Sequence, residues 1–167
     1  KILWADDEIE LLKPHILFLK KKGFIVNAVN SGEDALSLLK SERFDIVLLD
    51  EMMTGLDGLT TLRLIKVDHP NIPVVMITKN EDEWLMDEAL GQQISNYLTK
   101  PVNPSQVLLA CKSILEKTKL QYDHTAKSYL NEFNNISLDV NEAFQYSDWY
   151  AIYDKLIDWN LKIDSHS

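Results

Sequence analysis

The chain has 167 residues and a net charge of −9, and its 46% hydrophobic and 26% charged residues are typical of a globular protein. No apolar run approaches the roughly 20 residues that a membrane-spanning helix needs. No basic stripe is present that could drive binding to phosphates, so we expect neither membrane insertion nor direct nucleic-acid binding.

Five short apolar runs alternate with amphipathic segments of about 10–15 residues, which is the pattern of repeated βα units. The predicted strands are Ile2–Ala5, Phe24–Val29, Asp45–Leu49, Val74–Thr78 and Ser95–Leu98. Strands that are apolar almost throughout indicate a parallel sheet covered on both faces. The predicted fold class is therefore α/β, a doubly wound (βα)5 flavodoxin-like sheet with strand order 2-1-3-4-5.

The segments between these strands carry helix signals. A first helix ends at Lys20–Gly23, and Pro14 is expected in its first turn or at a kink. A second helix begins at the capping residue Ser31. The remaining predicted helices run from Leu59 to about Asp68, from Glu81 to about Gly91, and onward from Pro104.

The single cysteine, Cys111, lies in the apolar pattern of the fifth helix. One thiol cannot form an internal disulfide, which fits a reducing compartment, and we expect a cytoplasmic protein. A reactive thiol and a small buried side chain are both compatible with one cysteine, and the apolar surroundings favour the buried side chain.

The strand signals stop at about residue 117. Two helical patterns follow, one from Ala126 to Val140 and one from Ser147 to Ile163. Two helices cannot enclose a core alone, so we predict a small α-helical bundle completed by the end of the fifth helix. The predicted domains are residues 1–118 and residues 119–167.

Charged and hydroxyl side chains stand at the carboxyl ends of the predicted strands. Asp6 and Asp7 follow the first strand, Asp50 follows the third, Thr78 ends the fourth, and Lys100 comes directly after the fifth. In a doubly wound sheet of this order, ligands bind beyond the ends of strands 1 and 3. We therefore expect these side chains to meet at one edge of the sheet.

This set of residues suits the transfer of a phosphoryl group to a carboxylate. Asp50 would be the nucleophile, and Asp6, Asp7 and Asp50 would hold Mg²⁺, which prefers a few carboxylates together with water and phosphate oxygens. Lys100 would pair with one phosphate oxygen and Thr78 would offer its hydroxyl to another. Each residue alone has an ordinary structural explanation, as a helix cap, turn, strand-end or surface residue. Their conjunction favours a phosphoacceptor site.

Four motifs resemble the receiver domain of bacterial two-component response regulators over residues 1–117. They are Trp4–Glu8, Leu49–Gly58, Ile77–Thr78 and Tyr97–Pro101. The resemblance implies a phosphoryl group on the central aspartate and a partner sensor histidine kinase as its donor.

The same resemblance implies further roles. The backbone carbonyl of Met52 would complete the Mg²⁺ site, and Thr78 and Tyr97 would shift together when the acceptor is phosphorylated. The peptide bond before Pro101 is expected to be cis.

Three positions depart from the usual pattern of that family. Thr54 replaces a proline, which is expected to loosen the loop, Lys79 replaces a small residue, and Gln93 replaces a glycine. Lys79 could either crowd a phosphoryl group or add a second positive charge, and we favour the added charge. None of the three removes a required functional group.

The second segment resembles the helical linker of PorX-type regulators. The motifs that carry this resemblance are Phe133–Ser137 and Trp149–Leu156. That family is associated with type IX secretion and gliding motility, and its members continue into an alkaline-phosphatase-like domain that holds zinc. Such a domain would be an enzyme, but its metal site is not in this sequence.

The favoured hypothesis is a switch that is phosphorylated on Asp50, dimerises, and passes the signal to the helical module and then to a sigma factor or other regulatory protein. The alternative is an interaction module that works without phosphorylation. A phosphohydrolase of the haloacid type is excluded, because its nucleophile and second aspartate follow the first strand two residues apart, whereas this chain has Asp6-Asp7-Glu8 there.

Overall fold

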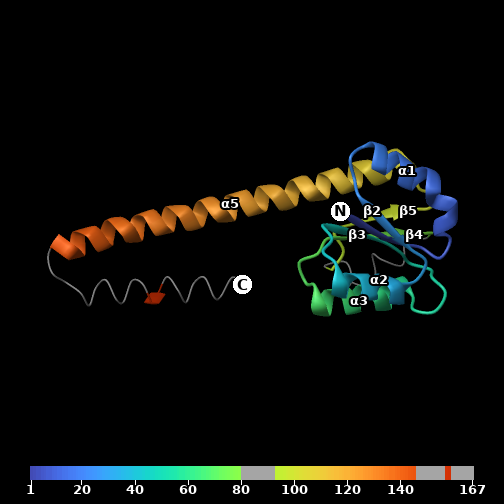
Figure 1. Cartoon of the computed structure of the whole chain (residues 1–167), viewed down its shortest axis with the longest axis horizontal. Coiled ribbons are helices and arrows are strands. Elements are labelled where there is room, and N and C mark those ends of the chain that lie inside the picture. The colour runs from blue at the N-terminus through green and yellow to red at the C-terminus, as the bar shows by residue number, and fades with distance from the viewer. Residues whose placement is uncertain (80–92, 146–156, 159–167) are drawn as a thin grey trace. The chain divides into compact units, whose positions relative to one another are not determined.

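A five-stranded parallel sheet forms the centre of the first part of the chain (Figure 1). The structure is a computed structural model and describes residues 1–79, 93–145 and 157–158. The strands are β1 (Ile2–Ala5), β2 (Val26–Val29), β3 (Ile46–Asp50), β4 (Val74–Thr78) and β5 (Asn96–Thr99). Their order is β2-β1-β3-β4-β5, which confirms the predicted fold class.

Helices cover both faces of the sheet, because both faces of its central strands are apolar (Figure 1). The 3₁₀ turn η1 (Ile9–Leu12), α1 (Lys13–Lys21) and the start of α5 (Pro104–Gln145) pack on one face. On the other face lie α2 (Gly32–Ser41) and α3 (Gly58–Asp68). The predicted helix Glu81–Gly91 falls outside the described residues.

Short-range signals fix where the helices begin and end. The hydroxyl of Ser31 accepts a hydrogen bond from the backbone N–H of Asp34 (3.2 Å), and the carboxylate of Asp57 accepts one from that of Thr60 (2.7 Å). Pro14 lies in the first turn of α1, as predicted. Gly23 follows α1 with a φ of 92°, a conformation that favours glycine.

Three predicted strand boundaries were shifted. β2 begins at Val26 rather than Phe24, because Val26 pairs with Ile2, the first residue of β1. β3 includes Asp50, which pairs with Ile77, and β5 is displaced by one residue to Asn96–Thr99. The pairing with neighbouring strands sets these ends, and the apolar pattern alone does not reveal it.

The chain divides into two compact units, Lys1–Lys117 and Thr118–Ser167. Helix α5 has 42 residues and belongs to both, so the pattern from Ala126 to Val140 is part of α5 and not the separate helix that was predicted. No glycine or proline interrupts the sequence after Pro104 within this helix.

The second predicted helix of the bundle, Ser147–Ile163, lies outside the described residues except for Ile157 and Asp158. The helical bundle therefore stays a prediction. Among the helices that the structure describes, none combines the length and apolar character needed to cross a bilayer.

Candidate functional site

The register of the sheet brings the predicted site residues to one edge. Ala5 pairs with Leu49, so that Asp6 leaves β1 at the level where Asp50 ends β3. On the other side of β3, Thr78 pairs with Thr99, and Lys100 follows directly. The carboxyl ends of four adjacent strands thus supply the charged and hydroxyl groups of a single site.

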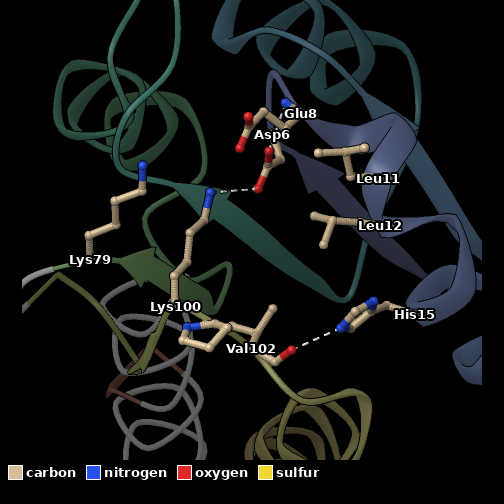
Figure 2. Close-up of a pocket in the computed structure, with 9 residues that line it drawn as sticks. Asp6, Glu8, Leu11, Leu12, His15, Lys79, Lys100 and Val102 are labelled. Atoms are coloured by element: carbon tan, nitrogen blue, oxygen red, sulfur yellow. Dashed lines mark hydrogen bonds and ion pairs between the residues drawn. The ribbon is translucent and has the colours of Figure 1, made fainter.

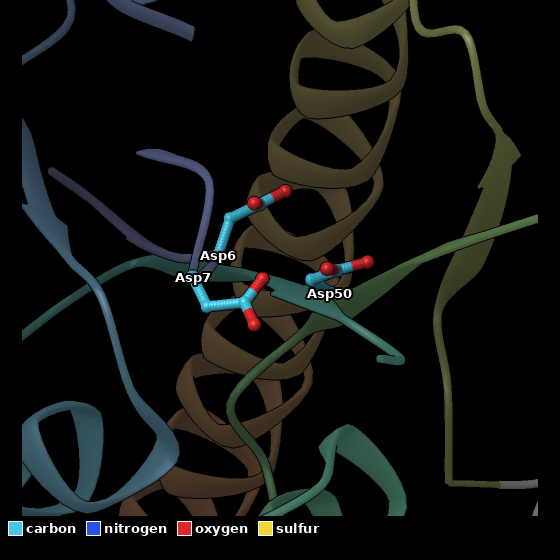
Figure 3. Close-up of side chains that lie close together, drawn as sticks. All are labelled: Asp6, Asp7 and Asp50. Atoms are coloured by element: carbon cyan, nitrogen blue, oxygen red, sulfur yellow. The ribbon is translucent and has the colours of Figure 1, made fainter. Parts of the chain in front are cut away.

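Three carboxylates lie at the centre of this edge (Figure 3). One oxygen from each of Asp6, Asp7 and Asp50 lies within 4.8 Å of the others. Asp6 and Asp50 are only 0% and 2% exposed, whereas Asp7 is exposed to solvent. Asp6 also accepts a hydrogen bond from the backbone N–H of Glu8 (2.9 Å), which fixes the turn after β1.

Lys100 bridges two of the three carboxylates. Its ammonium nitrogen lies 2.9 Å from Oδ2 of Asp50 and 3.1 Å from Oδ2 of Asp6. Burial alone would lower the pKa of Lys100, but the hydrogen bonds and negative charges of Asp50 and Asp6 outweigh burial and raise it. Lys100 is therefore protonated and positively charged at neutral pH.

The surroundings of Asp50 shift the pKa of its carboxyl group upward. Burial raises its pKa to about 6, the hydrogen bond from Lys100 opposes that shift, and the charge of Asp6 adds to it. At neutral pH the carboxyl is ionised, but burial makes the ionised form unfavourable in free energy. A cation that approached this edge would relieve the cost.

Glu51, a residue that the sequence analysis did not assign to the site, forms a hydrogen bond with Thr78. The buried Thr78 hydroxyl donates a hydrogen bond to Oε2 of Glu51, itself only 9% exposed. Glu51 follows Asp50 directly, and two adjacent acidic residues after a strand would have been the only signal in the sequence. In this structure the Thr78 hydroxyl is thus held by a neighbour of the predicted acceptor.

The loop after β3 contacts Asp7 through Thr54. Both the backbone N–H and the hydroxyl of Thr54 donate to Oδ2 of Asp7, each at 3.0 Å. A second side chain, Glu33 of α2, accepts a hydrogen bond from the backbone N–H of Leu56 in the same loop (3.2 Å). The expectation that threonine loosens the turn relative to proline stays a prediction.

Gly58 places the start of α3 against the acceptor. A Cβ atom on Gly58 would lie 2.2 Å from the carbonyl oxygen of Asp50, closer than any real contact. The backbone of α3 can reach the end of β3 only because this position has no side chain. Asp57, the capping residue of α3, stands next to it.

A cavity of about 450 Å³ opens beside the carboxylates (Figure 2). Figure 2 shows Lys79 next to Lys100, with the bond from His15 to the carbonyl of Val102 (2.9 Å) across the cavity. The lining residues are Asp6, Glu8, Leu11, Leu12, His15, Lys79, Lys100, Pro101 and Val102. Lys79 is exposed and adds positive charge to this side of the site.

The remaining predicted residues flank this edge. The Lys100–Pro101 peptide bond is cis, as expected. Tyr97 lies on the edge strand β5 with 41% of its surface exposed, and the Met52 side chain is 66% exposed.

Comparison with known proteins identifies this arrangement. The family model of the response regulator receiver domain matches residues 2–112, two thirds of the chain. The chain belongs to the response regulator receiver family. Response regulators are the receiving partners of two-component signalling systems. A second model, the PorX response regulator linker domain, matches residues 119–167.

Curated response regulators are about 30% identical to this chain over the aligned residues. It is 31% identical to the transcriptional regulatory protein CpxR homolog of Haemophilus influenzae over 169 residues, 98% of this chain and 70% of the relative. It is 30% identical to the response regulator MprA of Mycobacterium ulcerans over 139 residues, 83% of this chain. The match covers 60% of the length of MprA.

Solved receiver domains have the same fold. The receiver domain of NtrX from Brucella abortus is 27% identical and superposes with a TM-score of 0.62, covering 70% of this chain and 98% of its own. The Thermotoga maritima response regulator TrrA, solved in complex with Mg²⁺ and BeF, is 23% identical with a TM-score of 0.61, over 68% of this chain and 96% of its own.

Receiver domains bind Mg²⁺ through acidic residues, and the donor set of this response regulator fits that ion. It offers three carboxylates whose oxygens are mutually close, two of them buried. Carboxylate oxygens are the ligands that Mg²⁺ prefers, and a few of them leave room for water and phosphate oxygens. The spacing and chemistry of the cluster therefore agree with the family.

Proposed function

We propose that this response regulator accepts a phosphoryl group on Asp50 from a sensor histidine kinase. The observation that carries the proposal is the buried Asp50 carboxylate, which is paired with the ammonium group of Lys100 (2.9 Å) and lies close to the carboxylates of Asp6 and Asp7. Receiver domains are phosphorylated by sensor histidine kinases. A nucleophile, a fixed cation and a metal-binding set are the components that phosphoryl transfer requires.

The contact with Lys100 supports a separate role for each oxygen of Asp50. Lys100 holds Oδ2, which leaves Oδ1 to attack the phosphorus atom of a phosphohistidine. The new bond joins Oδ1 to phosphorus, and the bond between phosphorus and the histidine nitrogen breaks, so that the kinase histidine leaves with the electron pair. Asp6, Asp7, Asp50 and the carbonyl of Met52 would hold Mg²⁺, which neutralises charge on the transferred oxygens.

The Thr78 hydroxyl would report the new phosphoryl group. At present it donates to Glu51, and a phosphoryl oxygen on the neighbouring Asp50 would compete for the same proton. Glu51 and the phosphoryl group are both anionic, so phosphorylation also weakens the hold of Glu51 by repulsion. A shift of Thr78 would then be passed to Tyr97, which lies on the adjacent strand β5.

We further propose that the chain is the receiver and linker part of a PorX-type regulator of type IX secretion. The match of the PorX linker model to residues 119–167 supports this. Phosphorylation would promote dimerisation, and the helical module would carry the signal to a sigma factor or another regulatory protein. In the second unit, Leu120 and Leu130 of α5 are more than half exposed, which suits an assembly surface.

The test is phosphorylation in solution. Incubation with acetyl phosphate and Mg²⁺ should add one phosphoryl group, detected by intact mass, and beryllofluoride should shift the oligomeric state measured by light scattering. The matched control is Asp50→Asn, which should do neither. An unchanged mass and an unchanged oligomeric state in the wild type would reject the proposal.

A further inference from the structure

Thr54 makes two hydrogen bonds to the Asp7 carboxylate, one from its backbone and one from its side chain. Its backbone nitrogen and its hydroxyl oxygen both lie 3.0 Å from Oδ2 of Asp7. The two residues are 47 positions apart, one in the loop after β1 and the other in the loop after β3. The contact therefore joins the loop that carries Asp6 and Asp7 to the loop that follows Asp50.

Asp7 needs such a contact more than its two neighbours do. Asp6 and Asp50 are buried and paired with Lys100, so packing and an ion pair fix both of them. Asp7 is exposed, and no ion pair to it is found among the described residues. An exposed carboxylate without hydrogen bonds would sample several rotamers. Binding a cation would restrict it to one of them, at a cost in conformational entropy.

We infer that Thr54 is a positioning residue for the divalent cation: it fixes Oδ2 of Asp7 and thereby presents Oδ1 to the metal site. The inference rests on the proposed function, since it concerns the same Mg²⁺ site. In Figure 3 one oxygen of Asp7 faces Asp6 and Asp50 while the other is turned away, which is the arrangement that this division of roles requires. Partners that orient a metal ligand commonly change metal affinity about 10- to 100-fold when they are removed.

The two donors of Thr54 can be removed one at a time. Thr54→Ser keeps both, Thr54→Val keeps only the backbone N–H, and Thr54→Pro removes both, because proline has no N–H. Glu33→Ala is the matched control: it deletes another side-chain contact to this loop, the bond to the N–H of Leu56, without touching Asp7. If Mg²⁺ affinity falls with each hydrogen-bond donor removed from Thr54 but not with the loss of the Glu33 contact, the effect comes from the orientation of Asp7 and not from the general rigidity of the loop.

The experiment is a Mg²⁺ titration of the unphosphorylated full chain, followed by NMR shifts of the backbone amides around Asp7 and Asp50. The dissociation constant should stay at the wild-type value in Thr54→Ser and Glu33→Ala, rise about threefold in Thr54→Val and rise about tenfold in Thr54→Pro. Thermal melting in EDTA should give the wild-type midpoint for Thr54→Ser and a slightly lower one for Thr54→Val, since no cation is bound there and one exposed hydrogen bond is lost.

Equal Mg²⁺ affinity in the wild type and Thr54→Val would overturn the inference, even if Thr54→Pro does not fold. So would an effect of Glu33→Ala as large as that of Thr54→Val. If the wild type binds Mg²⁺ and is phosphorylated while the Thr54 variants match it, this inference fails and the proposed function stands. If the wild type binds no Mg²⁺ at all, both fail together.

Discussion

Replacing the acceptor carboxyl by an amide should stabilise the folded receiver unit. In Asp50→Asn the side chain keeps its shape but loses a charge that burial makes costly, as the rise of the Asp50 pKa from 3.8 to about 6 indicates. A difference of about 2 pKa units corresponds to about 3 kcal/mol at a pH above both values. Since Asp50 is 2% exposed, solvent screening reduces this figure little.

The same pKa values determine how the stability difference between Asp50→Asn and the wild type depends on pH. The folded-state pKa is raised above the unfolded one, so ionised Asp50 destabilises the fold above pH 6, and the penalty fades as the pH falls through 6 toward 3.8. The advantage of Asp50→Asn should therefore be about 3 kcal/mol at pH 7.5 and about 1.5 kcal/mol at pH 5. Saturating Mg²⁺ should reduce the advantage at pH 7.5, because the cation binds only the folded wild type.

Native-state hydrogen exchange of the amides in β1 and β3 measures this free energy within the receiver unit. The measurement is made in EDTA at both pH values. Asp57→Ala is the control: hydrogen bonding to the backbone N–H of Thr60 lowers the Asp57 pKa, so its carboxylate is ionised and capping α3 at both pH values. That variant should lose about 1 kcal/mol at pH 5 and pH 7.5 alike. An Asp50→Asn protein that is less stable than the wild type at pH 7.5, or a gain independent of pH, would refute the reasoning.

Two further substitutions test the surroundings of the acceptor. Glu51→Gln replaces the charged acceptor of the Thr78 hydroxyl by a neutral one, which weakens this hydrogen bond by about 1 kcal/mol. Beryllofluoride should then bind about fivefold more tightly in a titration. Equal or weaker binding would contradict the idea that Glu51 and the phosphoryl group compete for the Thr78 hydroxyl. Gly58→Ala forces a methyl group to within 2.2 Å of the Asp50 carbonyl oxygen, so thermal melting should show a loss of about 1–3 kcal/mol in the free energy of unfolding. Phosphorylation by acetyl phosphate should also be slower. Gly23→Ala meets no atom within 4 Å and should cost about 1 kcal/mol through its positive φ alone, with phosphorylation unchanged.

The sheet and the convergence of charged groups could be predicted because both follow from simple rules. Apolar runs with β-branched residues mark the strands, and parallel strands end at one edge, so Asp6, Asp50 and Lys100 had to approach one another. The structure brings them to within 3.1 Å through Lys100. The unbroken α5 was also readable in principle, since no helix breaker follows Pro104 within it.

The loop contacts could not be predicted in the same way. The bonds from Thr54 to Asp7 and from Thr78 to Glu51 join residues that are 47 and 27 positions apart. No periodicity encodes such contacts, because they depend on how two irregular loops lie beside each other. These contacts orient the Asp7 carboxylate and the Thr78 hydroxyl. The orientation of these two groups therefore depends on the loops, which sequence patterns describe least.

The burial of Cys111 has a practical consequence for probing this response regulator. The thiol is fully buried on the face of the sheet that α1 and α5 cover, and burial raises its pKa to about 12. Maleimide reagents attack the thiolate, so in the folded protein the native cysteine stays unlabelled. A fluorophore or spin label attached through an introduced cysteine at the exposed Met52 would follow events beside Asp50 while the natural thiol is left in place.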